Sequence, residues 1–470
     1  MKDQRILPYV VEVLEKPGGI TAWAGLPSVL DTTRAFGVDD LIREAIKIRK
    51  RNRGYSEARK VEALVLLMAA GGECVDDIKM LEEDAGLCRL VGQLPSADSL
   101  LSFLYAFHDE ALIERARAQL RGDRVAYIPE ENEALQGLAR VNVAFVHRVA
   151  AQGKSTRATL DHDATIQESH KREAQPHYKG GRGYQPSVIY WAEQDLAIGD
   201  EYRDGNVPAG MENLRLIRRG FAGLPDWVTE RYFRADSACY EEEVLKWLAN
   251  PAREGGPKGE IGFTISADMS QQLRETCAAV PEQRWQLAEE RAHETVWCAE
   301  VEFTPGDWPK DAKPLRYIAV RFRARQGQLF GNGSSMKYLA VVTNRSGEPL
   351  ELLRWHWQKA GTIESVHDVT KNELAARVPP CGRFGADAAW YRLSLLTYNV
   401  LSAMKSVALP SQLSNARPKR LRFSLFNIAG RIVSRGGKLI LRIATELERI
   451  VKLKEARARL AALPVFATSG

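Results

Sequence analysis

Carboxylate side chains recur at places where a folded chain could bring them together. Asp161 and Asp163 lie in T-R-A-T-L-D-H-D-A-T-I, whose alternation predicts a β-strand, so both carboxylates share one face of it. Asp236 ends a second predicted strand, W-V-T-E-R-Y-F-R-A-D, directly before a helix. Open α/β sheets place ligands and catalytic groups at such strand ends. A buried salt bridge or a helix cap is the structural alternative for each of these acids.

A further acidic residue lies in a predicted helix, T-I-E-S-V-H-D-V-T-K-N-E-L, at 362–374. Glu364 shares one charged face of it with His367, Asp368 and Lys371. Two acids from strand ends and Glu364 would form an open oxygen site for two Mg²⁺ or Mn²⁺ ions. Two such ions about 4 Å apart can activate water or a 3′-hydroxyl for displacement at phosphorus. These residues therefore predict metal-dependent phosphoryl transfer.

The pattern of apolar residues divides the chain into several blocks that must position these groups. Short helical patterns fill the N-terminal part, and strand and helix patterns alternate between 150 and 255. Strand patterns dominate 256–350, and mostly apolar helices follow over 351–410. The sequence therefore predicts a mixed α/β fold whose catalytic core is interrupted by a β-rich block.

Length, composition and cysteine spacing indicate the number of domains and the cellular compartment. The chain has 470 residues, of which 45% are hydrophobic and 27% charged, which suits two to four soluble domains. Six scattered cysteines without a C-x-x-C pair indicate free thiols and a reducing cytoplasm. The longest apolar run, at 64–70, is too short to cross a bilayer. We expect a cytoplasmic protein.

Positive charge is concentrated in two segments. Residues 411–470 carry 13 Lys and Arg against three acids, and K-I-R-K-R-N-R spans 47–53. Clustered cations bind a polyphosphate favourably because counterions are released from it. Solvated helix faces are the alternative. We expect DNA as the partner, with contacts from Lys47, Arg49, Lys50, Arg51 and Arg53.

The three acidic segments together resemble the catalytic blocks of bacterial insertion-sequence transposases with an RNase H-like DDE core. The IS-four-type group is the most similar branch, because it carries a β-strand insertion between its second Asp and its Glu and a Y-x2-R-x3-E-x6-K signature. The flanking P-P-C-G-R-F-G-A-D-A-A-W-Y-R-L also resembles this group. The resemblance implies an RNase H-like core (150–255 and 351–410), a β-rich insertion (256–350), an all-α DNA-binding domain (1–140) and a basic helical C-terminal segment (411–470).

Carried over residue by residue, the resemblance assigns the catalytic and metal-binding acids to Asp163, Asp236 and Glu364. Asp161 is the rival for the first acid. Lys371, seven residues after Glu364, matches the signature Lys and would hold a phosphate. The implied activity is cut-and-paste DNA transposition with two Mg²⁺ (or Mn²⁺) ions, through a hairpin intermediate, by a homodimer that bridges two inverted-repeat ends in the bacterial nucleoid.

The sequence departs from this signature at two positions. Trp357 replaces the Tyr and Ala360 the Arg, with Lys359 one position earlier. Trp357 could stack on a base and Lys359 could reach a phosphate as a point charge. Trp297 and Trp308 in the insertion are further candidates for stacking on a flipped base, although Trp297 also fits a strand core.

Other functions fit parts of the sequence less well. Two E-x-x-H motifs, at 364–367 and 290–293, suggest a di-iron protein, but that function leaves both strand acids and both basic segments unexplained. The glycine-rich stretches fit neither a phosphate loop nor a dinucleotide fingerprint. A catalytically inactive relative that only binds DNA remains the alternative, although three retained acids argue against it.

Overall fold

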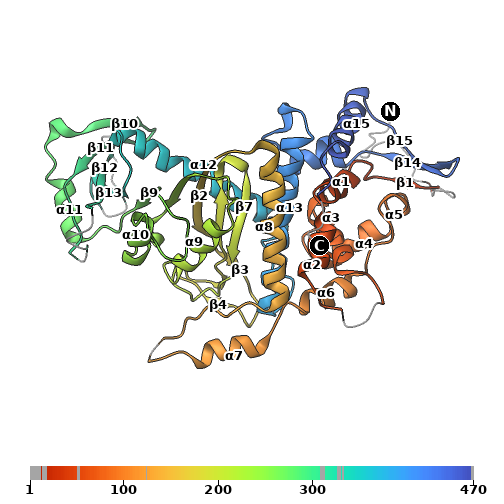
Figure 1. Ribbon diagram of the computed structural model, residues 1–470, viewed down its shortest axis with the longest axis horizontal. Coiled ribbons are helices and arrows are strands. Elements are labelled where there is room, and N and C mark those ends of the chain that lie inside the picture. Colours follow the sequence, from red (N-terminus) through yellow and green to blue (C-terminus); the bar gives the residue numbers. More distant parts are fainter. Residues whose placement is uncertain are drawn as a thin grey trace, which may run out of the picture.

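The computed structural model describes residues 12, 18–49, 53–122, 124–306, 308, 313–324, 330 and 333–466. Helices form one end, a mixed sheet the centre, and a β-rich extension the other end (Figure 1). The described part of the chain contains no helix that is long and apolar enough to span a membrane.

The N-terminal part is helical, as the sequence predicts. Ser56 caps α3, because its hydroxyl accepts a hydrogen bond from the backbone N–H of Arg59. The helix that Ser56 caps ends at Gly71, whose φ of 99° favours glycine. The elements are β1 (Ile20–Thr21), α1 (Pro27–Ala35), α2 (Val38–Ala45), α3 (Glu57–Ala70), α4 (Ile78–Glu82), α5 (Ala85–Val91), α6 (Ala97–Tyr105), α7 (Glu110–Ala118) and α8 (Glu133–Gly153).

A nine-stranded sheet runs through the centre of the molecule and into the insertion. Its strand order is β10-β11-β12-β13-β9-β8-β2-β6-β7. The core strands are β2 (Arg157–Ala164), β6 (Ser187–Trp191), β7 (Leu196–Glu201), β8 (Glu230–Ala235) and β9 (Ile261–Ser266). Strands β2, β8 and β9 are parallel, whereas β6 and β7 are antiparallel to their neighbours. This mixed sheet confirms the predicted α/β class; the RNase H-like assignment of the core stays a prediction.

The insertion continues the core sheet. Its strands are β10 (Gln286–Glu290), β11 (Glu294–Val301), β12 (Arg316–Ala324) and β13 (Met336–Thr343), and β13 pairs with β9. Helix α11 (Gln271–Ala278) lies beside them. A separate three-stranded sheet of β3 (Gln167–Glu168), β4 (Gln175–Pro176) and β5 (Arg182–Tyr184) follows β2 in the chain.

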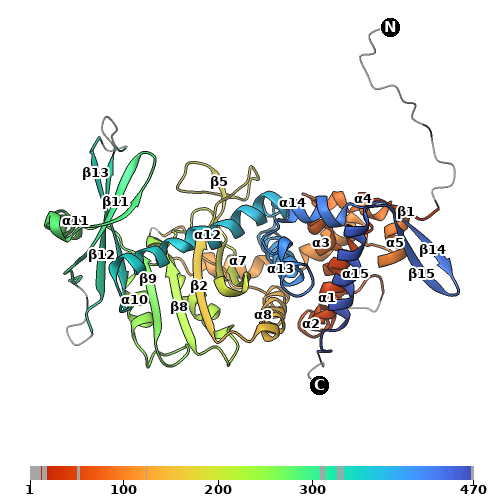
Figure 2. The same cartoon turned by 90° about the horizontal axis from the view of Figure 1, so that it is seen from above.

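Helices cover the two faces of the core sheet differently. On one face lie α9 (Asn213–Ala222) and α10 (Glu242–Ala249), where Phe221 of α9 packs against Phe233 of β8 with ring centroids 6.3 Å apart. On the other face the long helix α12 (Pro349–Glu373) crosses β9, β8 and β2 (Figure 2). The alternation of β2 therefore turns Asp161 and Asp163 toward α12 and Leu160 toward α9.

Helix α13 (Phe384–Val407) joins the sheet to the helical end. Most of its residues are buried, and it contacts β7, α8 and α3. One large apolar cluster therefore extends from the N-terminal helices through α13 to the core sheet. A smaller cluster joins the insertion strands to the start of α12, including Val296, Ile318 and Leu353.

The C-terminal segment contains helices, as predicted, and also a β-hairpin that the sequence did not predict. After α14 (Pro418–Leu421), strands β14 (Gly430–Arg435) and β15 (Lys438–Ile443) form this hairpin, and α15 (Leu447–Ala461) follows. Strand β14 also pairs with β1. The hairpin lies at the end of the molecule opposite the insertion (Figures 1 and 2).

Candidate active site

The carboxyl ends of two neighbouring parallel strands bring Asp163 and Asp236 together. Strand β2 pairs with β8 in a register that sets His162 opposite Ala235. Asp163 and Asp236 are each the next residue along their strands, so they occupy matching positions at the same edge. Burial raises the pKa of Asp236, the Lys359 charge opposes this rise, and the Asp163 carboxylate adds to it. The pairing register of β2 and β8 therefore places these two acids at neighbouring positions.

Burial shapes the electrostatics of this pair. The Asp163 side chain is 16% exposed, and burial raises its pKa, with the Lys359 charge opposing the rise. Burial also raises the pKa of Asp236, which Lys359 again lowers. Asp236 additionally caps the turn that follows β8, because its Oδ1 accepts a hydrogen bond of 3.1 Å from the Ala238 N–H. The nearby Lys359 charge therefore stabilises the ionised form of these two desolvated carboxylates.

Asp161, the rival first acid, is fully buried in an ion pair. Its two carboxylate oxygens accept hydrogen bonds of 2.6 and 2.9 Å from the guanidinium of Arg234 on β8, and the Thr362 hydroxyl also donates to it. Arg234 in turn donates to the Trp355 carbonyl oxygen, 2.7 Å away. These contacts occupy the Asp161 oxygens and connect β2, β8 and α12.

Helix α12 presents Lys359 and His367 to Asp163. The Lys359 Nζ lies 3.5 Å from Oδ1 of Asp163, and the His367 Nε2 lies 3.8 Å from Oδ2. Burial and the charges of Lys359 and Lys371 lower the pKa of His367 to about 3, so this imidazole is neutral near pH 7. Both ring nitrogens of His367 are buried without a hydrogen-bond partner among the described residues. The sequence assigned no chemistry to His367.

Glu364 occupies a different position from the strand acids. Its side chain is exposed on α12, one turn before His367. Among the described residues, no three His, Cys, Asp or Glu side chains lie close enough to hold a metal ion. The structure therefore brings Asp163 and Asp236 together and does not bring Glu364 to them, and the three-acid site stays a prediction.

The lysines and the tryptophan of α12 that were predicted to bind DNA are engaged within the protein. Lys371 donates from Nζ to the Ile166 carbonyl oxygen at 2.8 Å and thereby holds the segment after β2, and burial lowers its pKa. Lys359 lies on Asp163 rather than on the surface. Trp357 is half-buried beneath the guanidinium of Arg291, 5.3 Å from its ring centroid. Their roles toward DNA stay predictions.

The basic segment at 47–53 is only partly described, because Lys50 and Arg51 lie outside the described residues. The Arg49 Nε donates to the Glu57 carboxylate at 2.9 Å, and Lys47 Nζ contacts the Arg43 carbonyl oxygen. Arg53 is exposed. Within the described part, an internal carboxylate therefore already neutralises Arg49.

The tryptophans predicted to stack on a flipped base lie within the insertion. The Trp308 side chain is buried, and its Nε1–H donates to the Lys313 carbonyl oxygen at 3.2 Å. Trp297 is partly buried on β11, with the Arg321 guanidinium 5.6 Å from its ring centroid. Both rings have packing roles here, so stacking on DNA stays a prediction.

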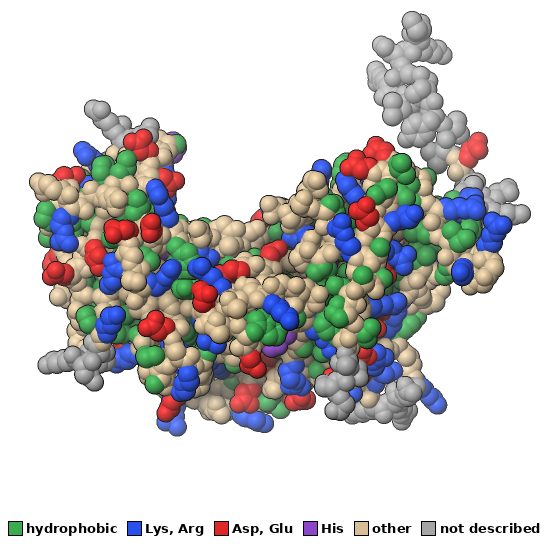
Figure 3. All heavy atoms as spheres, turned by 45° about the horizontal axis from the view of Figure 1, so that its top comes forward, with side chains coloured by type: hydrophobic (Ala, Val, Ile, Leu, Met, Phe, Trp, Pro, Cys, Tyr) green, Lys and Arg blue, Asp and Glu red, His purple; other side chains and the backbone are tan. Residues whose placement is uncertain are grey.

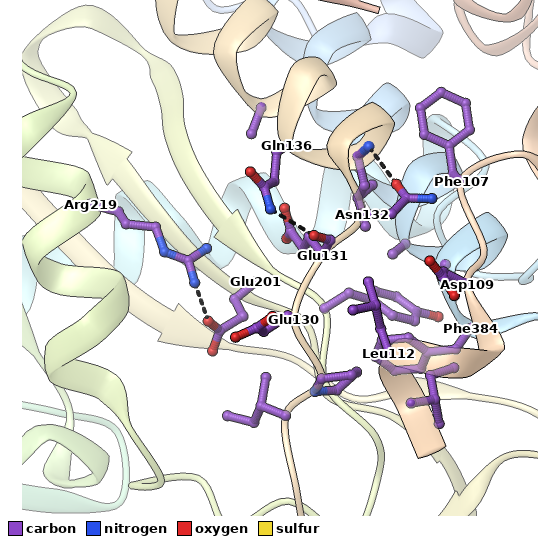
Figure 4. Close-up of a pocket in the computed structure, with 18 of the residues that line it drawn as sticks. Phe107, Asp109, Leu112, Glu130, Glu131, Asn132, Gln136, Glu201, Arg219 and Phe384 are labelled. Carbon is purple, nitrogen blue, oxygen red and sulfur yellow. Dashed lines mark hydrogen bonds and ion pairs between the residues drawn. The ribbon is translucent and has the colours of Figure 1, made fainter. Parts of the chain in front are cut away.

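A cavity of about 530 Å³ lies elsewhere, between α8, β7, α9 and the start of α13 (Figure 4). Its charged groups are largely paired: Arg219 bonds Glu201 at 2.9 Å, and Glu131 bonds Arg392 at 2.7 Å. None of the predicted catalytic acids is among its lining residues. This cavity is therefore separate from the paired acids.

The residues at the sheet edge fit a divalent cation in their chemistry. Asp163 and Asp236 supply two hard oxygen donors in a desolvated setting, which is the donor type that Mg²⁺ and Mn²⁺ take. His367 lies 3.8 Å from the Asp163 carboxylate, and its buried ring nitrogens form no hydrogen bond within the described part of the chain, so a bound ion or its water would satisfy this polar group.

Together, the mixed sheet and the two acids at its carboxyl edge define an α/β protein with a candidate catalytic site at the strand ends. The chain matches the family model for the transposase DDE domain, group 1, over residues 9–465, so it belongs to this family of DDE transposases. The IS-four-type subgroup and the bacterial source stay predictions.

Comparisons with curated proteins and with solved structures accompany this family assignment. No curated protein matches the chain. A solved structure of a piggyBac transposase synaptic complex with hairpin DNA is similar, with 10% sequence identity and a TM-score of 0.47. The similarity covers 84% of this chain and 78% of that chain.

Proposed function

We propose that this protein cuts and joins DNA at the ends of a mobile element, with Asp163 and Asp236 as the carboxylates that hold its divalent metal. The observation that carries the proposal is their matching position at the carboxyl ends of β2 and β8, in a chain of the DDE transposase family. Bound Mg²⁺ or Mn²⁺ would supply activation of a water or a 3′-hydroxyl and stabilisation of the leaving oxygen.

The side chains of α12 would complete this site. Glu364, which is exposed on α12 one turn before His367, is the third carboxylate in the proposal because it matches the Glu of the family signature. Lys359 neutralises the paired acids in the free protein and would contact a substrate phosphate bound beside them. Neutral His367 would accept a hydrogen bond beside Asp163.

DNA is the substrate in this proposal. The helical N-terminal part would bind terminal inverted repeats, with Lys47, Arg49 and Arg53 near phosphates, and Lys371 and Trp357 would act near the cut. We also propose that two copies bridge two ends in the nucleoid and that cleavage proceeds through a hairpin. The competing function, DNA binding without catalysis, predicts the same affinity but no cleavage.

A cleavage assay on DNA from the flanks of the gene tests the proposal. The protein is incubated with labelled duplexes that carry the flanking inverted repeats, in Mg²⁺ or in EDTA. We expect strand cleavage at the repeat only with Mg²⁺, strongly reduced by Glu364→Gln and unchanged by Glu351→Gln, an exposed Glu on the same helix. Binding without cleavage at every repeat would instead support the inactive relative.

A further inference from the structure

The C-terminal β-hairpin has one face that gathers positive charge. In the β14–β15 register, Arg431 lies opposite Arg442, Val433 opposite Ile440, and Arg435 opposite Lys438. Side chains of directly opposite residues point to the same face of a ribbon. One face therefore carries four cations in two cross-strand pairs, with an apolar pair between them.

These like-charge pairs are unfavourable in the free protein. Opposite residues on antiparallel strands have Cβ atoms about 5 Å apart, so two cations there repel and destabilise the hairpin. All four cations are exposed, and none has an ion pair with a carboxylate among the described residues. A bound polyanion would turn this repulsion into attraction.

The hairpin is anchored at its base, where β1 also pairs with β14 at Gly430 and Arg431, and its tip extends beyond β1 as a two-stranded ribbon. Ile432, on the opposite face, is buried, and the Arg89 guanidinium of α5 donates to the Ile432 carbonyl oxygen at 3.2 Å and to the Ser434 hydroxyl at 2.9 Å. The turn is Gly436-Gly437, with φ of 56° and 72°, which suits a two-residue hairpin turn. The four cations are thus presented on a fixed ribbon.

An exposed apolar side chain completes this face. Ile440 is 38% exposed between the two cation pairs. The hairpin forms one end of the molecule, and Lys and Arg side chains are visible at that end (Figure 3). The major groove of B-DNA is wide enough to admit a two-stranded ribbon, in which cations meet phosphates or base edges and an apolar group meets a thymine methyl.

We propose that the β14–β15 hairpin is a DNA-reading ribbon that enters a groove of the element's end DNA. This inference rests on the proposed function, because it assigns a second DNA contact to the same transposase. The partner is duplex DNA rather than a second copy of the chain, since two such cationic faces would repel each other.

Equilibrium binding without catalysis tests the ribbon. Anisotropy of labelled end duplexes is measured in EDTA at several salt concentrations, for the wild type and for a variant with Arg431, Arg435, Lys438 and Arg442 all changed to Gln. The variant should fold well, because the substitutions remove repulsion. We expect its affinity to fall by roughly tenfold or more, and its salt slope to fall by about one for each phosphate that the hairpin no longer neutralises.

A matched variant removes four other exposed charges, Arg115, Arg117, Arg121 and Arg124, in and after α7. An equal loss of affinity in this control, or unchanged binding by the hairpin variant, would overturn the inference. A change in the monomer–dimer equilibrium of the hairpin variant with DNA affinity retained would also overturn it. Failure of the wild type to bind any duplex would count against the proposed function itself.

Discussion

At the scale of single residues, β2 carries two aspartates with different tasks. Asp161 accepts hydrogen bonds from two of the three guanidinium nitrogens of Arg234 inside the protein, whereas Asp163 lies beside Asp236 at the strand end. The alternation of the strand predicted that both carboxylates share a face. It could not show which one Arg234 neutralises, because that depends on the register between β2 and β8.

This difference predicts unequal effects of the same substitution. We expect Asp161→Asn to lower the free energy of unfolding by about 3–5 kcal/mol, because the buried Arg234 charge loses its partner. Asp163→Asn should cost clearly less, since Asp236 remains near Lys359. Urea unfolding of both variants measures the difference. Equal losses of free energy of unfolding by the two variants would contradict the structural role assigned to the Asp161–Arg234 ion pair.

Lys359 gives a second prediction at this scale. Its ammonium group lies 3.5 Å from Asp163, where it competes with a divalent cation for the carboxylates. Lys359→Met should therefore strengthen Mn²⁺ binding in the absence of DNA, measured by electron paramagnetic resonance of free Mn²⁺ at about pH 7.5. Lys405→Met, which removes a lysine paired with Asp195 instead, is the control. Weaker Mn²⁺ binding by Lys359→Met would contradict this competition.

At the scale of elements, α12 connects the insertion, the sheet and the paired acids. Its residue His356 is buried, with ring nitrogens 2.9 and 3.0 Å from the hydroxyls of Thr264 and Ser266 on β9. Burial, with the Lys359 and Arg234 charges, lowers the pKa of His356 to about 3. The contact between α12 and β9 therefore depends on a neutral imidazole.

This contact predicts a pH dependence of stability. The folded-state pKa of His356 lies below the unfolded value near 6.5, so the unfolded chain binds more protons as the pH falls below about 6.5. The contribution of neutral His356 to the free energy of unfolding is fully present above about pH 6.5 and is lost as the pH falls toward 3. When the pH is lowered from 7 to 5, the free energy of unfolding should fall by about 1–2 kcal/mol less for His356→Gln than for the wild type. Urea unfolding at both pH values measures this difference. His170→Gln, at an exposed histidine, should follow the wild type; identical pH profiles for His356→Gln and the wild type would refute the prediction.

Several elements could be predicted from local pattern, and others could not, among them the C-terminal hairpin. The alternation in 157–164 and the apolar runs of the other core strands predicted β2, β6 and β8, and the short helical patterns predicted the N-terminal helices. The hairpin at 430–443 was missed because its many cations resemble a basic helical tail. Its signal was Gly436-Gly437 between two short runs that contain Ile and Leu.

At the scale of the whole molecule, the positions of the acids follow from distant segments. Glu364 and His367 are three residues apart on one helix, yet only His367 meets Asp163. Which side of α12 faces β2 is set by its packing across the sheet and against the insertion, and no local pattern contains that information. Figure 3 shows a hollowed face between the insertion and the helical end, and Figure 2 shows α12 running between these parts.

The most direct test of the central claim compares single-turnover strand cleavage in Mg²⁺ by the wild type, Asp163→Asn, Asp236→Asn and the control Asp226→Asn, an exposed aspartate outside the site. We predict that each site variant loses cleavage by roughly a thousandfold or more while its DNA affinity in EDTA stays within about threefold of the wild type, and that the control cuts normally. Cleavage at the wild-type rate by either site variant would contradict the assignment of the paired acids.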